Sequence, residues 1–545
     1  MSLMTPGLLL VATVAVPLAL LLACAFAPLR RVMPALAVLA PLPGLAAALT
    51  AVGVPPLVFG PPRLRLALAL DLPGAILLGV SALLWIAASR HALSSMRGTR
   101  AASRFVTCWI AALAGCLGAI VAADMVSLYG MLGLMTIGAT GLVIHDETPR
   151  AWRAGAVYFG MAIAGESVLL AGLVMAAAAT PGDSLLIRDA AAALAVSPQR
   201  DLALACIVGG LGLKAAIVPL HVWMPLAYPA APIPAASVMS GAVVKVSILS
   251  LIRFLPLGTV SPDWGQWLTT LGFIGAFYGV TLGLTQRDPK AVLAYSSVSQ
   301  MGVIVAVLGM GLATGDAMAG TSAAFYAAHH VLVKGALFLA VGVIACSTVE
   351  QRAAVLWPAA VLCLSLGGLP LTGGALAKYA VKDLLDVGLI GWLAAASAVG
   401  TTWLMLHFLR RLATSTADRG GSEPSLAPAW PWLATALAGM LVPWLIMADV
   451  GLGPAAATLA PKALWAAVWP VALGAVLAYV TRDAAARWPA VREGDLVVLL
   501  DAAGRGLVAA GARLQRADAA LRQWTVAALL LLAIVIAVGA SMILH

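Results

Sequence analysis

Apolar stretches of about 20 residues, the length an α-helix needs to cross a bilayer, recur along almost the whole chain. About sixteen such stretches can be placed between residues 5 and 544. Only 10% of the 545 residues are charged, whereas soluble domains contain about 25%. The sequence therefore predicts an all-α polytopic membrane protein with about 14–16 transmembrane helices.

The spans and the loops between them divide the chain into six parts. We expect N-terminal transmembrane helices over 1–104, a first half of the membrane domain over 105–254, a second half over 255–413, further transmembrane helices over 414–481, a cytoplasmic segment over 482–522 and a last transmembrane helix over 523–545. Arginines concentrate in alternate loops, and the positive-inside rule then places both termini outside the cell.

The cytoplasmic segment carries leucines at near-helical spacing between Asp495 and Leu521, with arginines on the other faces. This pattern predicts an amphipathic helix that lies on the membrane surface. A solvated linker is the alternative.

Lysines are distributed unusually, because five of the seven lie deep inside apolar stretches: Lys214, Lys245, Lys334, Lys378 and Lys382. The other two, Lys290 and Lys462, lie at span edges, and the 25 arginines are found mainly in loops. An ionisable side chain in hydrocarbon is energetically expensive and is a functional-site hypothesis by default. Burial can move the pKa of a lysine towards neutrality, whereas arginine stays charged. The lysines therefore predict a proton path.

Two spans are interrupted by helix-breaking residues close to one of these lysines. Five prolines, from Pro219 to Pro234, follow Lys214, and a Gly/Pro cluster over 367–374 precedes Lys378. A pair of interrupted helices in the two halves of a transporter indicates the binding or conduction site. Ordinary proline kinks are the alternative.

Histidines accompany the lysines, and histidine titrates near neutral pH. His221 is seven residues from Lys214, and His330 is four residues from Lys334, so each pair is expected to share a helix face. We place His221 and His330 in the proton path. His329, about 100° away on the helix, is a weaker candidate that is expected to be structural.

Acidic residues are scarce in the spans, and Glu166 is the only glutamate deep in one. A buried carboxylate needs a partner, and a lysine on a neighbouring helix is the obvious one. Asp124 and Asp71 lie near span ends and are expected to be structural, although Asp124 is kept as a candidate. Lys382 approaches the outer end of the interrupted helix, where it either functions or snorkels to the interface.

Four motifs in order resemble one family: LKAAIVPLHVWMPLAYPAAPIPAASVMSGAVVKVSILSLIR (213–253), TQRDPKAVLAYSSVSQMG (285–302), AFYAAHHVLVKGALFLA (324–340) and LPLTGGALAKYAVKD (369–383). They are similar to the antiporter-like subunits of respiratory complex I, Mrp-type cation/proton antiporters and membrane-bound (group 4) hydrogenases. The resemblance covers about residues 100 to 400.

The resemblance implies two inverted five-helix repeats, each a half channel with one broken helix. It assigns Lys214 to the first break, Lys245 to the central relay, His330 and Lys334 to the second-half relay, and Lys378 to the second break. The surface helix corresponds to a shortened lateral helix. One departure stands out: the glutamate that usually partners the first-half lysine is replaced by Gly133, and Glu166 is the substitute on offer.

The expected function is translocation of protons or sodium ions as an antiporter-like subunit of a multisubunit complex in the bacterial inner membrane. The cysteines are isolated and no phosphate-binding loop occurs, so we expect no cofactor or metal in this chain and no binding of nucleic acid. Partners would be other membrane subunits, the lipid bilayer and a cytoplasmic redox or carbon-uptake module, and whether the assembly is an enzyme depends on them. The alternatives are the membrane subunit of a proton-coupled inorganic-carbon uptake system and a non-conducting scaffold.

Overall fold

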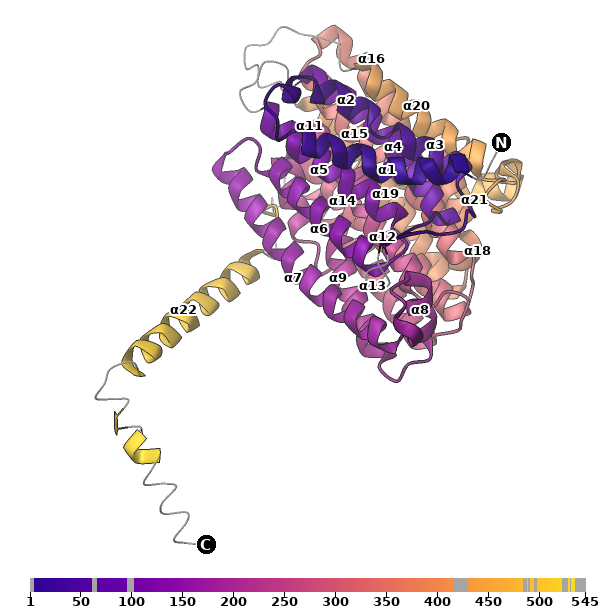
Figure 1. The fold of residues 1–545 in the computed structure, drawn as a ribbon. Helices are drawn as coiled ribbons and strands as arrows, with labels where there is room; N and C mark the ends of the chain where they lie inside the picture. The colour runs from indigo at the N-terminus through magenta and orange to yellow at the C-terminus, as the bar shows by residue number, and fades with distance from the viewer. Residues whose placement is uncertain are drawn as a thin grey trace. The chain divides into compact units, whose positions relative to one another are not determined.

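The computed structural model describes residues 4–60, 66–95, 102–415, 429–483, 488, 491–494, 497–521, 528–529 and 531–534. The chain divides into two compact units, Met1–Glu493 and Gly494–His545. The first unit is a bundle of helices (Figure 1).

Fourteen helical stretches in the described part of the chain are long and apolar enough to span a membrane, which confirms the predicted all-α polytopic fold. They are α1 (Met4–Ala23), α2 with α3 (Met33–Leu39 and Leu42–Thr50), α4 (Leu72–Ser95), α5 (Ala102–Val121), α6 (Met125–Val143), α7 (Pro149–Ala179), α11 to α12 (Ile233–Val238 and Val244–Phe254), α13 (Pro262–Leu284), α14 (Pro289–Thr314), α15 (Ala319–Ala345), α16 (Val349–Gly367), α19 (Gly388–Thr414), α20 (Ala429–Ile446) and α21 (Pro461–Val480). Between α11 and α12 the helix continues as a π-helical turn, η3 (Met239–Val243).

Shorter elements connect or interrupt these spans. The helices are α8 (Ile187–Ala195), α9 (Arg200–Lys214), α10 (Trp223–Ala230), α17 (Gly373–Ala380) and α18 (Lys382–Leu385), with single 3₁₀ turns η1 (Leu29–Arg31), η2 (Pro181–Asp183) and η4 (Ala455–Leu459). A small antiparallel hairpin, β1 (Leu57–Phe59) and β2 (Leu66–Leu68), joins α3 to α4 and was not expected from the sequence.

Both predicted interruptions are present. The first separates α9 from α10 over residues 215–222, and the second separates α16 from α17 over residues 368–372. Each contains a non-glycine residue with left-handed backbone, Ala216 (φ 57°) and Leu371 (φ 65°). That conformation is uncommon for residues with a Cβ atom, so both breaks are true departures from helical geometry and not gentle kinks.

The first break corrects one expectation about His221. Lys214 is the last residue of α9, and His221 lies in the non-helical segment before α10. Counting helical turns across this segment is invalid because residues 215–222 do not follow the 3.6-residue repeat. His221 and Lys214 therefore do not share a helix face.

Three helical stretches form the centre of the bundle. Helix α14 is buried along its span, and α11 to α12 and α15 are buried along nearly all of theirs. In the outer helices α1 and α21 only 22% of the span is buried within the isolated chain, and large apolar residues such as Leu8 and Trp465 are exposed. The lysine-bearing helices α12 and α15 are thus shielded by other parts of the protein.

Helix starts are fixed by residues that satisfy free backbone N–H groups. Thr148 caps α7 and Asp288 caps α14, each followed by proline at the first helical position. Thr348 and Gln351 form a capping box at the start of α16.

The second unit contains helix α22 (Val497–Leu521). A helix was predicted within the cytoplasmic segment, and two apolar side chains of its described part, Val508 and Leu514, are more than 70% exposed. Most of the last predicted transmembrane helix, 523–545, lies outside the described residues. The boundaries of the six predicted parts, and the location of α22 on the membrane surface, stay predictions.

Candidate functional site

The first break is the place where a buried ion pair forms. Lys214 Nζ lies 2.6 Å from Glu166 Oε1, and the two side chains are 7% and 10% exposed. Thr136 completes the cluster: its hydroxyl oxygen accepts a hydrogen bond from Lys214 (2.7 Å) and its hydroxyl lies 2.7 Å from the same carboxylate oxygen. Helices α6, α7 and α9 thus meet at one buried lysine. The predicted pairing of Glu166 with Lys214 is confirmed.

Gly133, where the family resemblance places the usual glutamate, lies on the helix that carries Thr136. Gly133 is three residues before Thr136 on α6, which puts both on one side of the helix. A Cβ atom built at Gly133 would meet no atom within 4 Å. A Cβ atom at this position is therefore free of contacts with the described part of the chain.

Lys245 is held within its own helix. Its ammonium donates to the main-chain carbonyl of Ser240 at 2.6 Å, and the side chain is buried. Ser240 belongs to the π-helical turn η3, and its hydroxyl lies 2.9 Å from that of Ser297 on α14. Turns of π-helix occur frequently at functional sites.

Lys334 is held by the neighbouring helix. Its ammonium donates to the carbonyl of Leu293 on α14 at 2.9 Å. The Ser297 hydroxyl donates to the same carbonyl at 3.0 Å. His330, one turn before Lys334 on α15, is fully buried, and neither of its ring nitrogens makes a hydrogen bond within the described residues.

The second break is tied to α15 by His329. Its Nε2 lies 2.9 Å from the hydroxyl oxygen of Ser365, which also accepts the main-chain N–H of Gly374 at 3.2 Å. A Cβ atom at Gly374 would lie 1.6 Å from the carbonyl oxygen of Ser365, so only glycine permits this approach. Lys378 donates to the carbonyl of Gly367 at the end of α16. His329, expected to be structural, thus joins the relay helix to the second break.

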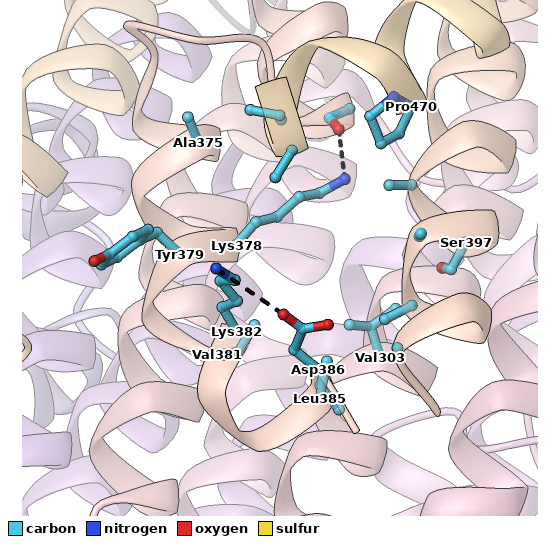
Figure 2. Close-up of a pocket in the computed structure, with 18 of the residues that line it drawn as sticks. Val303, Ala375, Lys378, Tyr379, Val381, Lys382, Leu385, Asp386, Ser397 and Pro470 are labelled. Atoms are coloured by element: carbon cyan, nitrogen blue, oxygen red, sulfur yellow. Dashed lines mark hydrogen bonds and ion pairs between the residues drawn. The ribbon is translucent and has the colours of Figure 1, made fainter. Parts of the chain in front are cut away.

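A cavity of about 560 Å³ opens beside Lys378. Figure 2 shows Lys378 and Lys382 projecting into it from the broken helix, with Ser397 of α19 on the opposite side and Pro470 of α21 at one end. Lys382 Nζ lies 4.0 Å from Asp386 Oδ2, and both line the cavity. The Ser397 hydroxyl has no hydrogen-bond partner within the described part of the chain.

Two sequence candidates have other roles in the structure. Asp124 caps α6, accepting the backbone N–H groups of Ser127 (2.7 Å) and Ala67 (2.6 Å), which fits a structural residue. His221 packs edge-on against Tyr278, with ring centroids 4.7 Å apart.

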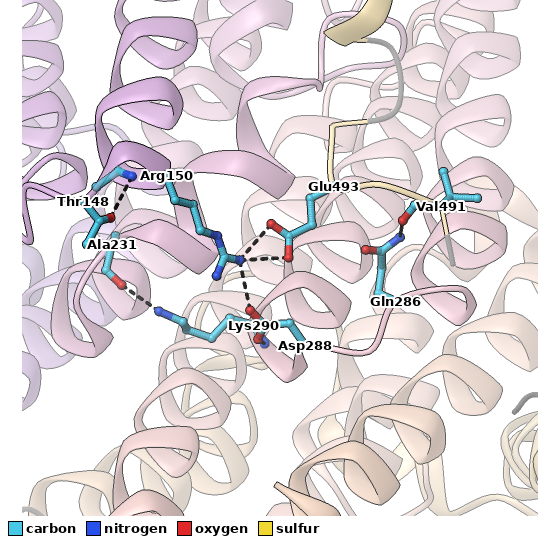
Figure 3. A network of polar contacts seen from close by, with 9 residues as sticks. Thr148, Arg150, Ala231, Gln286, Asp288, Lys290, Val491 and Glu493 are labelled. Atoms are coloured by element: carbon cyan, nitrogen blue, oxygen red, sulfur yellow. Dashed lines mark hydrogen bonds and ion pairs between the residues drawn. The ribbon is translucent and has the colours of Figure 1, made fainter. Parts of the chain in front are cut away.

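The starts of α7 and α14 are joined by a polar cluster (Figure 3). Arg150 binds both carboxylate oxygens of Glu493 at 2.8 Å and Asp288 at 3.2 Å. Gln286 donates to the carbonyl of Val491 at 3.2 Å. Burial raises the pKa of Glu493, and the charge of Arg150 opposes this shift.

Sequence reasoning missed the hydroxyl side chains of Thr136, Ser240, Ser297 and Ser365. Ser240 and Ser297 lie in two of the motifs quoted above, but Thr136 and Ser365 carried no comparable signal. Hydroxyl residues are common in transmembrane helices, and their partners are set by tertiary packing.

Comparison with known proteins gives a consistent result. Residues 122–404 match the transmembrane family described as NADH:quinone oxidoreductase/Mrp antiporter. The chain is 31% identical over 414 residues to NADH-quinone oxidoreductase subunit N of Desulforudis audaxviator, covering 71% of this chain and 81% of that one. It is 29% identical over 352 residues to hydrogenase-4 component B of Escherichia coli, covering 58% and 50%.

Solved structures share the fold at lower identity. A chain of the Mrp complex from Dietzia sp. superposes with a TM-score of 0.68 at 21% identity, covering 86% of this chain and 99% of that one. A chain of the membrane-bound sulfane sulfur reductase, an archaeal respiratory membrane complex, gives 0.73 at 20% identity, covering 98% and 100%. With broken helices and buried lysines where the motifs predicted them, the chain belongs to the family of antiporter-like membrane subunits shared by NADH:quinone oxidoreductases and Mrp antiporters.

Proposed function

We propose that this antiporter-like subunit translocates protons or sodium ions across the membrane. The observation that carries the proposal is the buried contact of Lys214 with Glu166 and Thr136 at the first break. A lysine paired with a carboxylate favours its charged form, and separation of the pair makes release of a proton easier. A pair that can form and separate is what the loading step of a pump requires.

The remaining lysines extend the path through the centre of the bundle to the second break. Lys245 and Lys334 are held by main-chain carbonyls in the buried centre, and Lys378 is held by a carbonyl at the second break. Their proposed order is Lys214, Lys245, Lys334 with His330, and then Lys378. His329 joins this set because it bonds Ser365 at the break.

The cavity beside Lys378 would give the path access to solvent. Its volume of about 560 Å³ is enough for several waters at roughly 30 Å³ each. Lys382, Asp386 and Ser397 supply polar partners along its wall. We assign Lys382 to the polar wall of this cavity.

The driving reaction is proposed to reside in partner subunits. The relatives named above are components of quinone oxidoreductase and hydrogenase complexes, and the structural neighbours belong to multisubunit membrane assemblies. We propose other membrane subunits and a cytoplasmic redox module as partners, in a bacterial inner membrane with both termini outside. The names of these relatives favour neither a carbon-uptake system nor a non-conducting scaffold.

The test is ion transport by the assembled complex in inverted membrane vesicles. Lys214→Ala should abolish transport while the complex still assembles, whereas Lys462→Ala, an exposed lysine at the start of α21, should leave it unchanged. Normal transport by Lys214→Ala would instead support a scaffold.

A further inference from the structure

The two central lysines are connected through two serine hydroxyls. Lys245 holds the carbonyl of Ser240, whose hydroxyl lies 2.9 Å from that of Ser297. Ser297 in turn donates to the carbonyl of Leu293, which also accepts from Lys334. Hydrogen bonds, together with the covalent link between the carbonyl and the hydroxyl of Ser240, therefore connect η3 through α14 to α15.

We propose that Ser240 and Ser297 form a hydroxyl bridge that couples Lys245 to Lys334, so that the state of one lysine sets how firmly the other is held. The inference rests on the proposed ion translocation. Both serines are positioning residues, because neither hydroxyl takes up the transported ion in this scheme.

The bridge can adopt two directions because each hydroxyl has one hydrogen to donate. When Ser297 donates to Leu293, the bond between the serines must run from Ser240 to Ser297. When Ser297 turns its hydrogen to Ser240, the carbonyl of Leu293 keeps Lys334 as its side-chain donor. The hydrogen bond from the Lys334 ammonium is charge-assisted. The Leu293 carbonyl accepts it more strongly when it does not also accept from Ser297. Reversing the direction of the hydrogen bond between the two serines therefore changes the strength of the hydrogen bond from Lys334 to Leu293.

The absence of carboxylate partners makes these carbonyls important. Among the residues that the structure describes, neither Lys245 nor Lys334 forms an ion pair, whereas Lys214 pairs with Glu166. The titratable group that acts on Lys245 is the basic Lys334, and Lys245, Lys334 and His329 act on His330. The Cys363 thiol acts on Lys334, but it forms no ion pair with it. Main-chain carbonyls are thus the groups that stabilise an ammonium here.

The π-helical turn provides the mechanical link on the Lys245 side. The ammonium of Lys245 bonds the carbonyl five residues earlier, within the turn that carries the Ser240 hydroxyl. A Cβ atom at Gly241 would lie 2.2 Å from a methyl group of Leu84 and 3.0 Å from the carbonyl oxygen of Val331, so glycine lets the turn approach α4 and α15 closely. One turn earlier, Ser237 anchors α11 to the carbonyl of Gly335 at 3.0 Å. When the hydrogen bond from Lys245 to this carbonyl breaks, the resulting backbone movement is concentrated at Ser240.

The experiment compares serines of one helix in the assembled complex. Ser297→Ala should lower the ion transport rate in vesicles roughly five- to tenfold, the effect of losing about one buried hydrogen bond. Ser297→Thr, which keeps the hydroxyl, should restore most of the rate. The matched control is Ser299→Ala, since Ser299 is also buried on α14 and its hydroxyl has no hydrogen-bond partner in the described residues. Rates are normalised to the amount of assembled complex.

A double-mutant cycle decides between a bridge and two separate contacts. Ser240→Ala should lower the rate by a similar factor, and Ser240→Ala with Ser297→Ala should lower it no further, because both changes break one unit. The proposal is overturned if Ser297→Ala behaves like Ser299→Ala, or if the two single effects multiply in the double variant. Lys245→Ala separates a failure of the bridge from a failure of the proposed function. If Lys245→Ala transports ions normally, the proposed ion path is wrong. If Lys245→Ala abolishes transport but Ser297→Ala leaves it normal, only the bridge is wrong.

Discussion

Glu166 and Lys214 form a buried ion pair between α7 and α9, with Thr136 of α6 bound to both side chains. The family resemblance places the acidic partner at Gly133 on α6, and in this chain Glu166 of α7 supplies the carboxylate that contacts Lys214. We propose that this contact between α7 and α9 forms and separates during transport.

Glu166→Gln should abolish or strongly impair ion transport, because it removes the negative charge while leaving a buried amide. Breaking a buried pair by removing one partner also destabilises a protein by about 3–5 kcal/mol, which thermal unfolding of the detergent-solubilised protein would detect. Adding Gly133→Glu should recover part of the transport, since a Cβ atom at Gly133 would meet no atom of the described chain within 4 Å. Glu166→Gln with Gly130→Glu, an exposed position about one helical turn further from Thr136 along α6, is the control. Equal recovery from both added glutamates would contradict the argument.

Lys245→Ala should eliminate transport without loss of the assembled complex. The side chain is buried beside Lys334 and His330, and no carboxylate pairs with it among the described residues. Removal of the ammonium relieves local repulsion, so folding should tolerate the change while the relay loses a member. The measurement is transport per assembled complex, with Lys462→Ala as the control. Unchanged pumping would exclude Lys245 from the path.

Stability at acid pH should depend on Asp71. Arg253 donates to its two carboxylate oxygens at 2.8 and 3.0 Å and also to the carbonyls of Ile120 and Ala122. Burial by itself would raise the pKa of Asp71, but the charge and hydrogen bonds of Arg253, with the N–H of Gly74, lower it. A carboxyl whose pKa is lower in the folded state stabilises the protein above its unfolded pKa, and this contribution is lost as the pH falls through the folded pKa.

The expected result is a fall in unfolding temperature below about pH 4 that is smaller in Asp71→Asn, measured by thermal unfolding in detergent. Asp71→Asn should also be less stable than the unaltered protein at neutral pH. The control is Asp483→Asn, whose side chain is 87% exposed beside Arg482. An identical acid-side fall in both variants would show that Asp71 does not contribute.

Helix α22 should hold partners or lipid headgroups through its leucines. Replacing Leu499, Leu507 and Leu514 by Asp should reduce the yield of assembled complex, because a charged face cannot cover apolar surface. Leu514 is 71% exposed within this chain. Replacing Arg505, Arg513 and Arg516 by Gln is the control for helix content. If the triple Asp variant assembles and transports normally, the segment is a linker.

Some of this architecture is readable from the sequence, for physical reasons. Span lengths follow from the thickness of the bilayer, and the breaks follow from proline and glycine, so α9 to α10 and α16 to α17 could be predicted. Glu166 could be paired with Lys214 because deep acids are scarce. His221 was misplaced because the helical repeat does not continue through the break.

The hydroxyl partners could not be predicted with the same reasoning. Thr136, Ser240 and Ser297 act through neighbours on other helices or through the π-helical turn, and neither is encoded by local spacing. Lys245 donates to a carbonyl of its own helix, and the spacing of ionisable residues does not indicate this contact.

Arg150 forms ion pairs with two carboxylates, Asp288 at the start of α14 and Glu493 at the end of the first unit. The two acids would repel each other without it, so loss of the arginine is more disruptive than loss of either acid. Glu493 is also the residue from which the C-terminal unit departs. The C-terminal unit therefore begins in the sequence directly after a residue whose carboxylate is fixed, through Arg150, to the starts of α7 and α14.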